Sequence, residues 1–181
     1  VVGAELIANG EEGYRADVSA QVYNHGTITC SRFEVNGTSF LYNVGKLESS
    51  SDVYVANSTS KIVNDNTIES ASVHVEGSGA VQNNAEWIVS GNTIVNCTDG
   101  GWVNNGYWKT QNYGYTAGSE NVINNCFLEV TNDFDMNISS GTGAFKIDTG
   151  GSVLTNNFYG GRDKSTNATS GPLKIIMRQD A

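Results

Sequence analysis

Aromatic side chains gather between Trp102 and Tyr115, and their neighbours in the sequence are amides. Five of the 17 aromatic residues of the chain fall in these 14 positions, and they are Trp102, Tyr107, Trp108, Tyr113 and Tyr115. An aromatic ring can stack on the apolar face of a sugar while Asn and Gln side chains bind the hydroxyl groups. The segment therefore predicts a surface site for a glycan or a partner subunit, and packing of the rings onto the domain is the alternative.

Oxygen-bearing side chains alternate at Asp133, Asp135 and Asn137, as they do at the first ligand positions of a calcium loop. The position where an EF-hand requires glycine is Ile138, and the position of its bidentate Glu is Ala144. A weak calcium site outside the EF-hand class is therefore one interpretation, and an acidic turn between strands is the other. The sequence indicates no other cofactor.

Groups that could perform catalysis are scattered along the chain. His25 and His74 have no Ser, Asp or Cys partner at a spacing typical of a catalytic motif, and the charged segment 160–164 is typical of a surface turn. We therefore predict no catalytic residues and a non-enzymatic protein, with a polysaccharide lyase or hydrolase as the minority alternative.

Cysteine and asparagine bear on the cellular compartment. The odd number of cysteines allows at most one internal disulfide, and small buried apolar residues are the favoured interpretation of Cys30, Cys97 and Cys126. Asn-X-Ser/Thr motifs, which chance alone would produce almost as often in so Asn-rich a chain, stand at Asn36, Asn57, Asn96, Asn137 and Asn167. These motifs are compatible with glycosylation of a secreted or cell-surface protein, which is the location that we expect.

The elements that must position these residues are expected to be strands. The 181 residues suffice for one domain, 1–181, and contain 22 Asn, 21 Gly, 18 Ser and 15 Thr, all of which are poor in the interior of helices. Segments such as 72–76 alternate apolar and polar residues, as half-buried strands do. The net charge of −9 and the lack of a basic run oppose nucleic-acid binding, and no apolar stretch is long enough for a membrane span.

An Asn-rich string recurs along the chain. Segments 62–68 and 88–94 share an apolar pair, two turn residues and Asn-Thr-Ile, and more divergent copies occupy 33–40, 122–127 and 153–158. The closing apolar residues of the five copies lie 28, 26, 33 and 31 residues apart. A coil of three short strands and three turns has a similar length, and its stacked Asn amides can bond from coil to coil as a ladder. The repeat thus predicts an all-β solenoid with coils of about 26–33 residues.

These strings, over about residues 33–160, resemble the Asn-Asn-Thr-Phe/Ile repeats of right-handed parallel β-helix proteins of the pectate-lyase-like superfamily, which includes adhesin-like surface proteins. The resemblance implies a right-handed parallel β-helix. Residues 98–119 fall in the longest coil, so we expect them to form an aromatic-rich loop insertion. A β-sandwich or jelly roll with strand-like termini donated to neighbouring copies is the alternative fold.

Apolar, strand-like segments stand at residues 1–8 and 172–178, and the sequence offers no amphipathic helix that could cap a β-helix. Such segments can add to a neighbour's sheet edge or simply complete the sheet of their own domain. The sequence thus predicts an extracellular structural protein, a subunit of a surface filament or adhesin stalk that binds copies of itself. A carbohydrate-active module that binds or cleaves polysaccharide through the aromatic-rich segment is the alternative.

Overall fold

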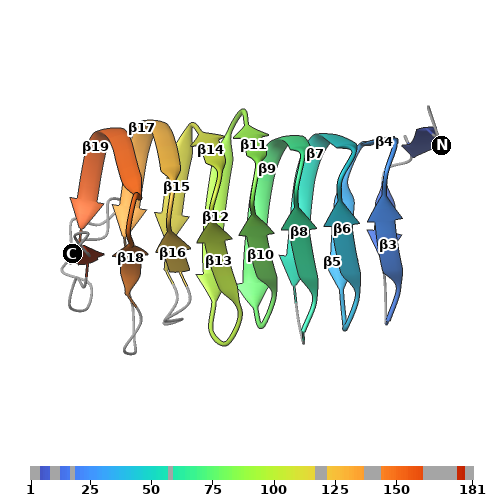
Figure 1. Cartoon of the computed structure of the whole chain (residues 1–181), viewed down its shortest axis with the longest axis horizontal. Coiled ribbons are helices and arrows are strands. Elements are labelled where there is room, and N and C mark those ends of the chain that lie inside the picture. The colour runs from blue at the N-terminus through green and yellow to red at the C-terminus, as the bar shows by residue number, and fades with distance from the viewer. Residues whose placement is uncertain are drawn as a thin grey trace.

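The computed structural model is an elongated β-helix of about seven turns, with the N-terminal and C-terminal turns at opposite ends of its long axis (Figure 1). It describes residues 5–8, 13–16, 19–56, 59–116, 122–136, 144–160 and 175–177. All pairings between the described strands are parallel, so the prediction of a parallel β-helix is confirmed and the β-sandwich alternative is wrong. No described segment forms a helix that could cross a membrane.

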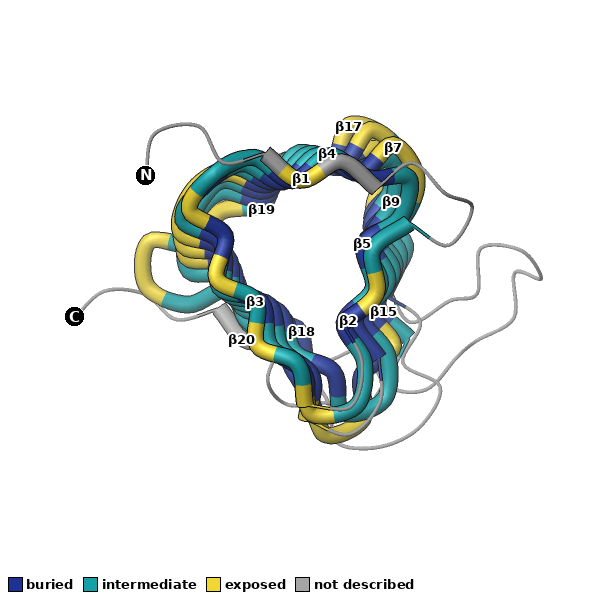
Figure 2. The backbone as a smooth tube through the Cα atoms, turned by 90° about the vertical axis from the view of Figure 1, so that its right-hand side faces the viewer, coloured by how far each residue is buried: buried dark blue, intermediate teal, exposed yellow. Residues whose placement is uncertain are grey.

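The cross-section of the β-helix has three sides (Figure 2). We call the eight-stranded sheet the third face, and its strands are β3 (Gln21–Asn24), β6 (Phe40–Asn43), β8 (Lys61–Asn64), β10 (Ala80–Asn83), β13 (Gly101–Asn104), β16 (Val122–Asn124), β18 (Phe145–Ile147) and β20 (Ile175–Met177).

The other sheet covers the two remaining sides. The first face follows the third face in each turn and contains β1 (Glu5–Ala8), β4 (Thr27–Cys30), β11 (Glu86–Val89) and β14 (Tyr107–Thr110). The second face contains β2 (Tyr14–Ala16), β5 (Phe33–Asn36), β12 (Asn92–Cys97) and β15 (Asn112–Tyr115). Four long strands run along the first face and bend into the second, and they are β7 (Lys46–Ala56), β9 (Thr67–Gly77), β17 (Phe127–Met136) and β19 (Ser152–Gly160).

Alternating burial explains why these short segments are strands. In β8, Ile62 and Asn64 point into the core while Lys61 and Val63 point outward, and the same alternation recurs on the third-face strands β6 and β10. Parallel strands one turn apart place equivalent residues at the spacing of about 4.8 Å between neighbouring strands. The core is therefore a set of columns of like residues running along the axis.

The lengths of the turns differ from the prediction. Equivalent residues along the Asn corner are 19, 21, 19, 21 and 20 residues apart, so the expected coils of 26–33 residues are too long. Ile68 pairs with Trp87, whereas Ile94 lies on the second face and pairs with His74. The expected equivalence of Ile68 and Ile94 is wrong, because the two Asn-Thr-Ile strings occupy different corners of the β-helix.

The predicted Asn ladder exists, and it is buried where the third face meets the first. Each side-chain amide donates to the side-chain oxygen of the next Asn over 2.6–2.9 Å, through Asn24, Asn43, Asn64, Asn83, Asn104 and Asn124. The same nitrogens also donate to backbone carbonyl oxygens in the following turn, as Asn83 does to Tyr107 over 3.0 Å. A buried amide is stabilising only when its donors and acceptor are satisfied, and this corner satisfies them in every turn.

Candidate functional site

The aromatic segment that the sequence marks as a binding surface lies mostly in the core. Trp102, Trp108, Tyr113 and Tyr115 are all 0% exposed. Trp108 stacks on Trp87 of the preceding turn with ring centroids 4.5 Å apart, and Trp102 packs edge-on against Trp108 at 5.2 Å. These four rings cannot stack on a glycan or touch a partner, so their prediction as a surface site is wrong.

The predicted loop insertion over residues 98–119 is likewise wrong for its described part. Residues 101–115 form β13, β14 and β15, which add one strand to each of the three faces. The rings fill the interior of this regular turn, as the packing alternative predicts. Tyr107 alone of the five faces outward; it is half-buried, its hydroxyl donates to Glu129, and its ring stacks on Phe127.

Asp133 and Asp135 lie on the outer side of β17, where they border a groove of about 270 Å³ over Gly114. The Asp133 carboxylate accepts a hydrogen bond from Asn157 over 2.9 Å. Asn137 lies outside the described residues, and within those residues no three His, Cys, Asp or Glu side chains are close enough to hold a metal ion. A calcium site here stays a prediction without a described third ligand.

The predicted glycosylation motifs and cysteines are distributed as follows. Asn96 is exposed and Asn36 is half-buried, whereas Asn57, Asn137 and Asn167 lie outside the described residues. Cys30 and Cys97 are buried, Cys126 is half-buried, and all three are present as thiols. Burial raises the pKa of the Cys30 thiol to about 11, which keeps this thiol protonated and unreactive at neutral pH.

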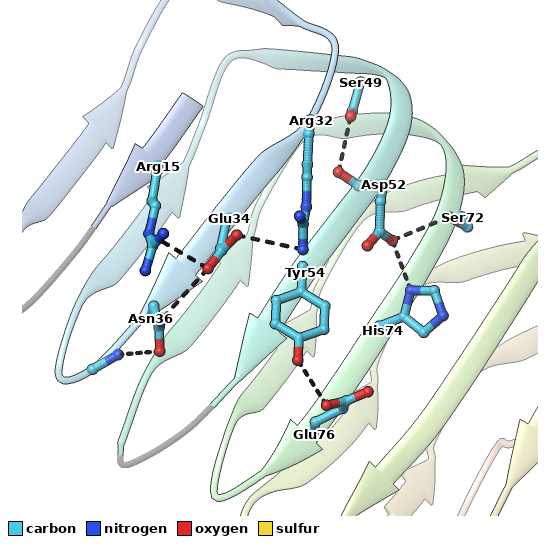
Figure 3. Close-up of polar contacts among 11 residues, drawn as sticks. Arg15, Arg32, Glu34, Asn36, Ser49, Asp52, Tyr54, Ser72, His74 and Glu76 are labelled. Carbon is cyan, nitrogen blue, oxygen red and sulfur yellow. Dashed lines mark hydrogen bonds and ion pairs between the residues drawn. The ribbon is translucent and has the colours of Figure 1, made fainter. Parts of the chain in front are cut away.

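The densest group of ionisable side chains lies on the outer side of the second face (Figure 3). It arises from register, because Glu34, Tyr54 and His74 occupy equivalent positions on β5, β7 and β9. Arg15 precedes them in the same column on β2. The sequence does not reveal this group under a coil of 26–33 residues, but the 20-residue steps from Glu34 to Tyr54 and on to His74 match the spacing of the Asn ladder.

Asp52 binds two side chains of the following turn through one carboxylate oxygen. The Nδ1 atom of His74 lies 2.9 Å from Asp52 Oδ1, and the Ser72 hydroxyl donates to the same oxygen over 3.0 Å. The hydrogen bond to Asp52 is the main cause of a raised pKa of His74, with partial burial acting against it. Ser72 therefore directs its proton to Asp52, which is not the geometry of a serine nucleophile activated by histidine.

The remaining members of the group form compensated pairs. Glu34 accepts from Arg15 at 3.5 Å and from Arg32 at 3.4 Å, and the Arg32 guanidinium lies 5.0 Å from the centroid of the Tyr54 ring. The Tyr54 hydroxyl donates to Glu76 over 2.7 Å, and this bond is the main reason that the pKa of Tyr54 is raised to about 12. Each charge thus binds a neighbour in its own or an adjacent turn, and the group ties successive turns together.

The two ends of the β-helix are the other candidate site. Among the described strands, β1, β2 and β3 at one end and β19 and β20 at the other each pair on one side only. β1 pairs with β4 and β20 with β18, so the described parts of the terminal segments complete the chain's own sheets. Apolar side chains are exposed there, with Leu6 42% and Phe158 44% exposed.

Comparison of the chain with protein-family models, with curated proteins and with solved structures finds no match.

Proposed function

We propose that this protein is a non-enzymatic structural β-helix, a subunit of an extracellular surface filament or adhesin stalk, in which copies stack end to end. The observation that carries the proposal is the pair of one-sided ends, where strands β1 and β20 have unpaired outer edges and Leu6 and Phe158 are exposed. An unpaired parallel edge is a template for a further strand.

The geometry of the ends favours stacking from head to tail. The N-terminal and C-terminal ends are different surfaces, so a contact between them is heterologous and leaves a free end for the next copy. Such contacts generate open filaments when the rotation does not close a ring. Stacking would extend the same parallel sheets from one copy to the next, without the donation of a terminal strand.

The expected energies also favour association. Each backbone hydrogen bond formed across the junction contributes about 1 kcal/mol, and burial of apolar side chains such as Leu6 and Phe158 adds to it. The net charge of −9 opposes association, but salt screens charges beyond about 8–10 Å at ordinary ionic strength. Contacts at the junction are shorter than this distance, so attraction should dominate.

The regular body of the β-helix suits a stalk. The buried Asn ladder runs through six successive turns, and the core columns continue along the same axis. Exposed Asn96 is available for glycosylation in an extracellular compartment. The carbohydrate-active alternative has lost its main support, since four of the five aromatic residues that motivated it are core residues.

The test is electron microscopy and sedimentation velocity of the full chain, with Leu6→Lys and Phe158→Lys as variants. We expect rods several chain lengths long from the unmodified protein, and single particles from both variants, because a lysine at the junction would be buried without a partner. Tyr23→Lys, which adds the same charge to the exposed side of the third face, is the control and should still form rods.

Thermal unfolding of each variant separates loss of stacking from loss of folding, because Phe158 also packs against Phe134 in its own chain. The proposal is wrong if the unmodified chain stays monomeric at high concentration. It is equally wrong if a folded Leu6→Lys variant forms the same rods as the unmodified chain.

A further inference from the structure

The outer side of the third face carries three aromatic rings on two neighbouring strands. Tyr23 is 59% exposed, and Phe40 and Tyr42 are half-buried. The rings of Tyr23 and Phe40 meet edge-on with centroids 6.3 Å apart, and those of Phe40 and Tyr42 lie 6.4 Å apart with nearly parallel planes. We call these three rings the aromatic ridge. Because all three point away from the core, they contribute little to the packing of the interior.

A groove continues from the aromatic ridge along the same face. Its volume is about 500 Å³, which is within the range of small-molecule sites, and its lining includes Lys61, Ala80, Gln82, Gly101 and Val103. The strand register aligns Phe40 with Lys61, Lys61 with Ala80, and Ala80 with Gly101. The ridge and the groove therefore form one strip that runs along the axis, from large flat side chains to small ones.

Hydrogen-bonding side chains border this strip. Tyr42 donates its hydroxyl proton to Asp65, and Asn84 donates to the other oxygen of Asp65 over 2.6 Å. Gln82 donates to Asn84 over 3.0 Å and accepts from Lys61 over 3.3 Å. A side-chain amide has two N–H donors and a carbonyl with two lone pairs, so the amide of Gln82 retains a donor and an acceptor site for a ligand. The side chains are thereby fixed in place before any ligand arrives.

The charge on the strip selects among ligands. Lys61 and Asp65 carry opposite charges, and the protein as a whole carries −9, which disfavours a polyanion such as a nucleic acid or a uronate polymer. A ligand that matches flat rings, small side chains and neutral amides is uncharged, has apolar faces and carries many hydroxyl groups. A chain of neutral sugars has these properties, since the apolar face of a pyranose packs on an aromatic ring while its hydroxyls bind amides.

We propose that the aromatic ridge and the adjoining groove bind a neutral polysaccharide chain that lies along the axis of the β-helix. This site is on the side of the β-helix and is separate from the ends through which copies are proposed to stack. It differs from the site predicted by the sequence, because its rings are Tyr23, Phe40 and Tyr42 rather than the aromatic residues between 102 and 115.

The experiment measures retention of the full chain by immobilised neutral polysaccharides, with cellulose, chitin, β-1,3-glucan and mannan as the probes and alginate as the acidic comparison. We expect the unmodified chain to bind at least one neutral polymer, and the double variant Tyr23→Ala/Phe40→Ala to bind it at least tenfold more weakly. Phe127→Ala is the matched control, because it removes an outward, half-buried ring from another face. It should bind like the unmodified chain.

A variant of the groove gives a second, independent measurement. Ala80→Arg places a bulky side chain on the strip without touching the aromatic ridge, and it should also reduce binding at least tenfold while the unfolding temperature stays within a few degrees. The proposal is overturned if no neutral polymer of the panel retains the unmodified chain. It is also overturned if the folded double variant binds as well as the unmodified chain, or if the double variant loses end-to-end rods and not polysaccharide binding.

Discussion

The side-chain nitrogen of Asn83 lies 2.9 Å from the side-chain oxygen of Asn104, to which it donates one hydrogen, and 3.0 Å from the backbone oxygen of Tyr107, to which it donates the other. The oxygen of Asn83 in turn accepts from Asn64 over 2.8 Å. One buried amide thus joins three successive turns of the β-helix. Aspartate cannot replace it, because a carboxylate accepts hydrogen bonds and does not donate them.

Asn83→Ala should lower the free energy of unfolding by about 2–4 kcal/mol, since it removes the hydrogen bonds of Asn83 and leaves partners in adjacent turns unsatisfied in the core. Urea denaturation monitored by circular dichroism measures the change. Asn84→Ala is the control: Asn84 is exposed and belongs to an outer row of amides, so its removal should cost less than about 1 kcal/mol. Equal losses in the two variants would contradict a special role for the buried ladder.

Two glycines give opposite predictions for the same substitution. A Cβ atom at Gly106 would lie 2.1 Å from the backbone oxygen of Ala85 in the preceding turn, whereas a Cβ atom at Gly114 would meet no atom within 4 Å. Gly106→Ala should therefore push two turns apart and destabilise the fold by more than about 2 kcal/mol. Gly114→Ala should leave stability unchanged or raise it slightly, because it restricts the unfolded chain. Thermal unfolding distinguishes them, and a harmless Gly106→Ala would contradict the close approach of the turns.

The bond between His74 and Asp52 makes stability depend on pH. The pKa of His74 is raised in the folded state, so folding favours its protonated form. The resulting stabilisation is complete below the unfolded pKa of about 6.5 and is lost as the pH rises through the higher folded value. Glu76 nearby supports the raised pKa and Arg32 opposes it.

The stability advantage of the unmodified chain over His74→Gln should therefore be largest near pH 5.5 and shrink toward pH 8.5. Denaturation midpoints at a series of pH values measure it, and NMR titration of the His74 ring gives the folded pKa directly. Asp52→Asn should bring that pKa down, because it removes the main cause of the shift. A folded pKa of His74 at or below 6.5 in the unmodified chain would contradict the prediction.

Local properties of the sequence sufficed to predict strands, their parallel stacking and an Asn ladder. The alternation of apolar and polar residues fixes which side of each strand is buried, and Asn64 and Asn124 stand in strings that the sequence marks as repeats. These features depend on neighbouring residues only, through the two-residue period of a strand and the hydrogen-bonding capacity of an amide.

The phase of the coils was decided by the tertiary structure. Segments 62–68 and 88–94 look alike because the two corners both favour Asn followed by Thr and Ile, but Ile68 points into the core and Ile94 points outward. Only the pairing of each turn with the next distinguishes the corners, since it requires many hydrogen bonds and core contacts to match at once. The same holds for the aromatic residues, because a ring at Trp102 or at Tyr23 is equally apolar as a sequence position. Which ring is covered depends on which side of its strand faces the other two faces of the β-helix, and this is a property of the closed coil rather than of the segment.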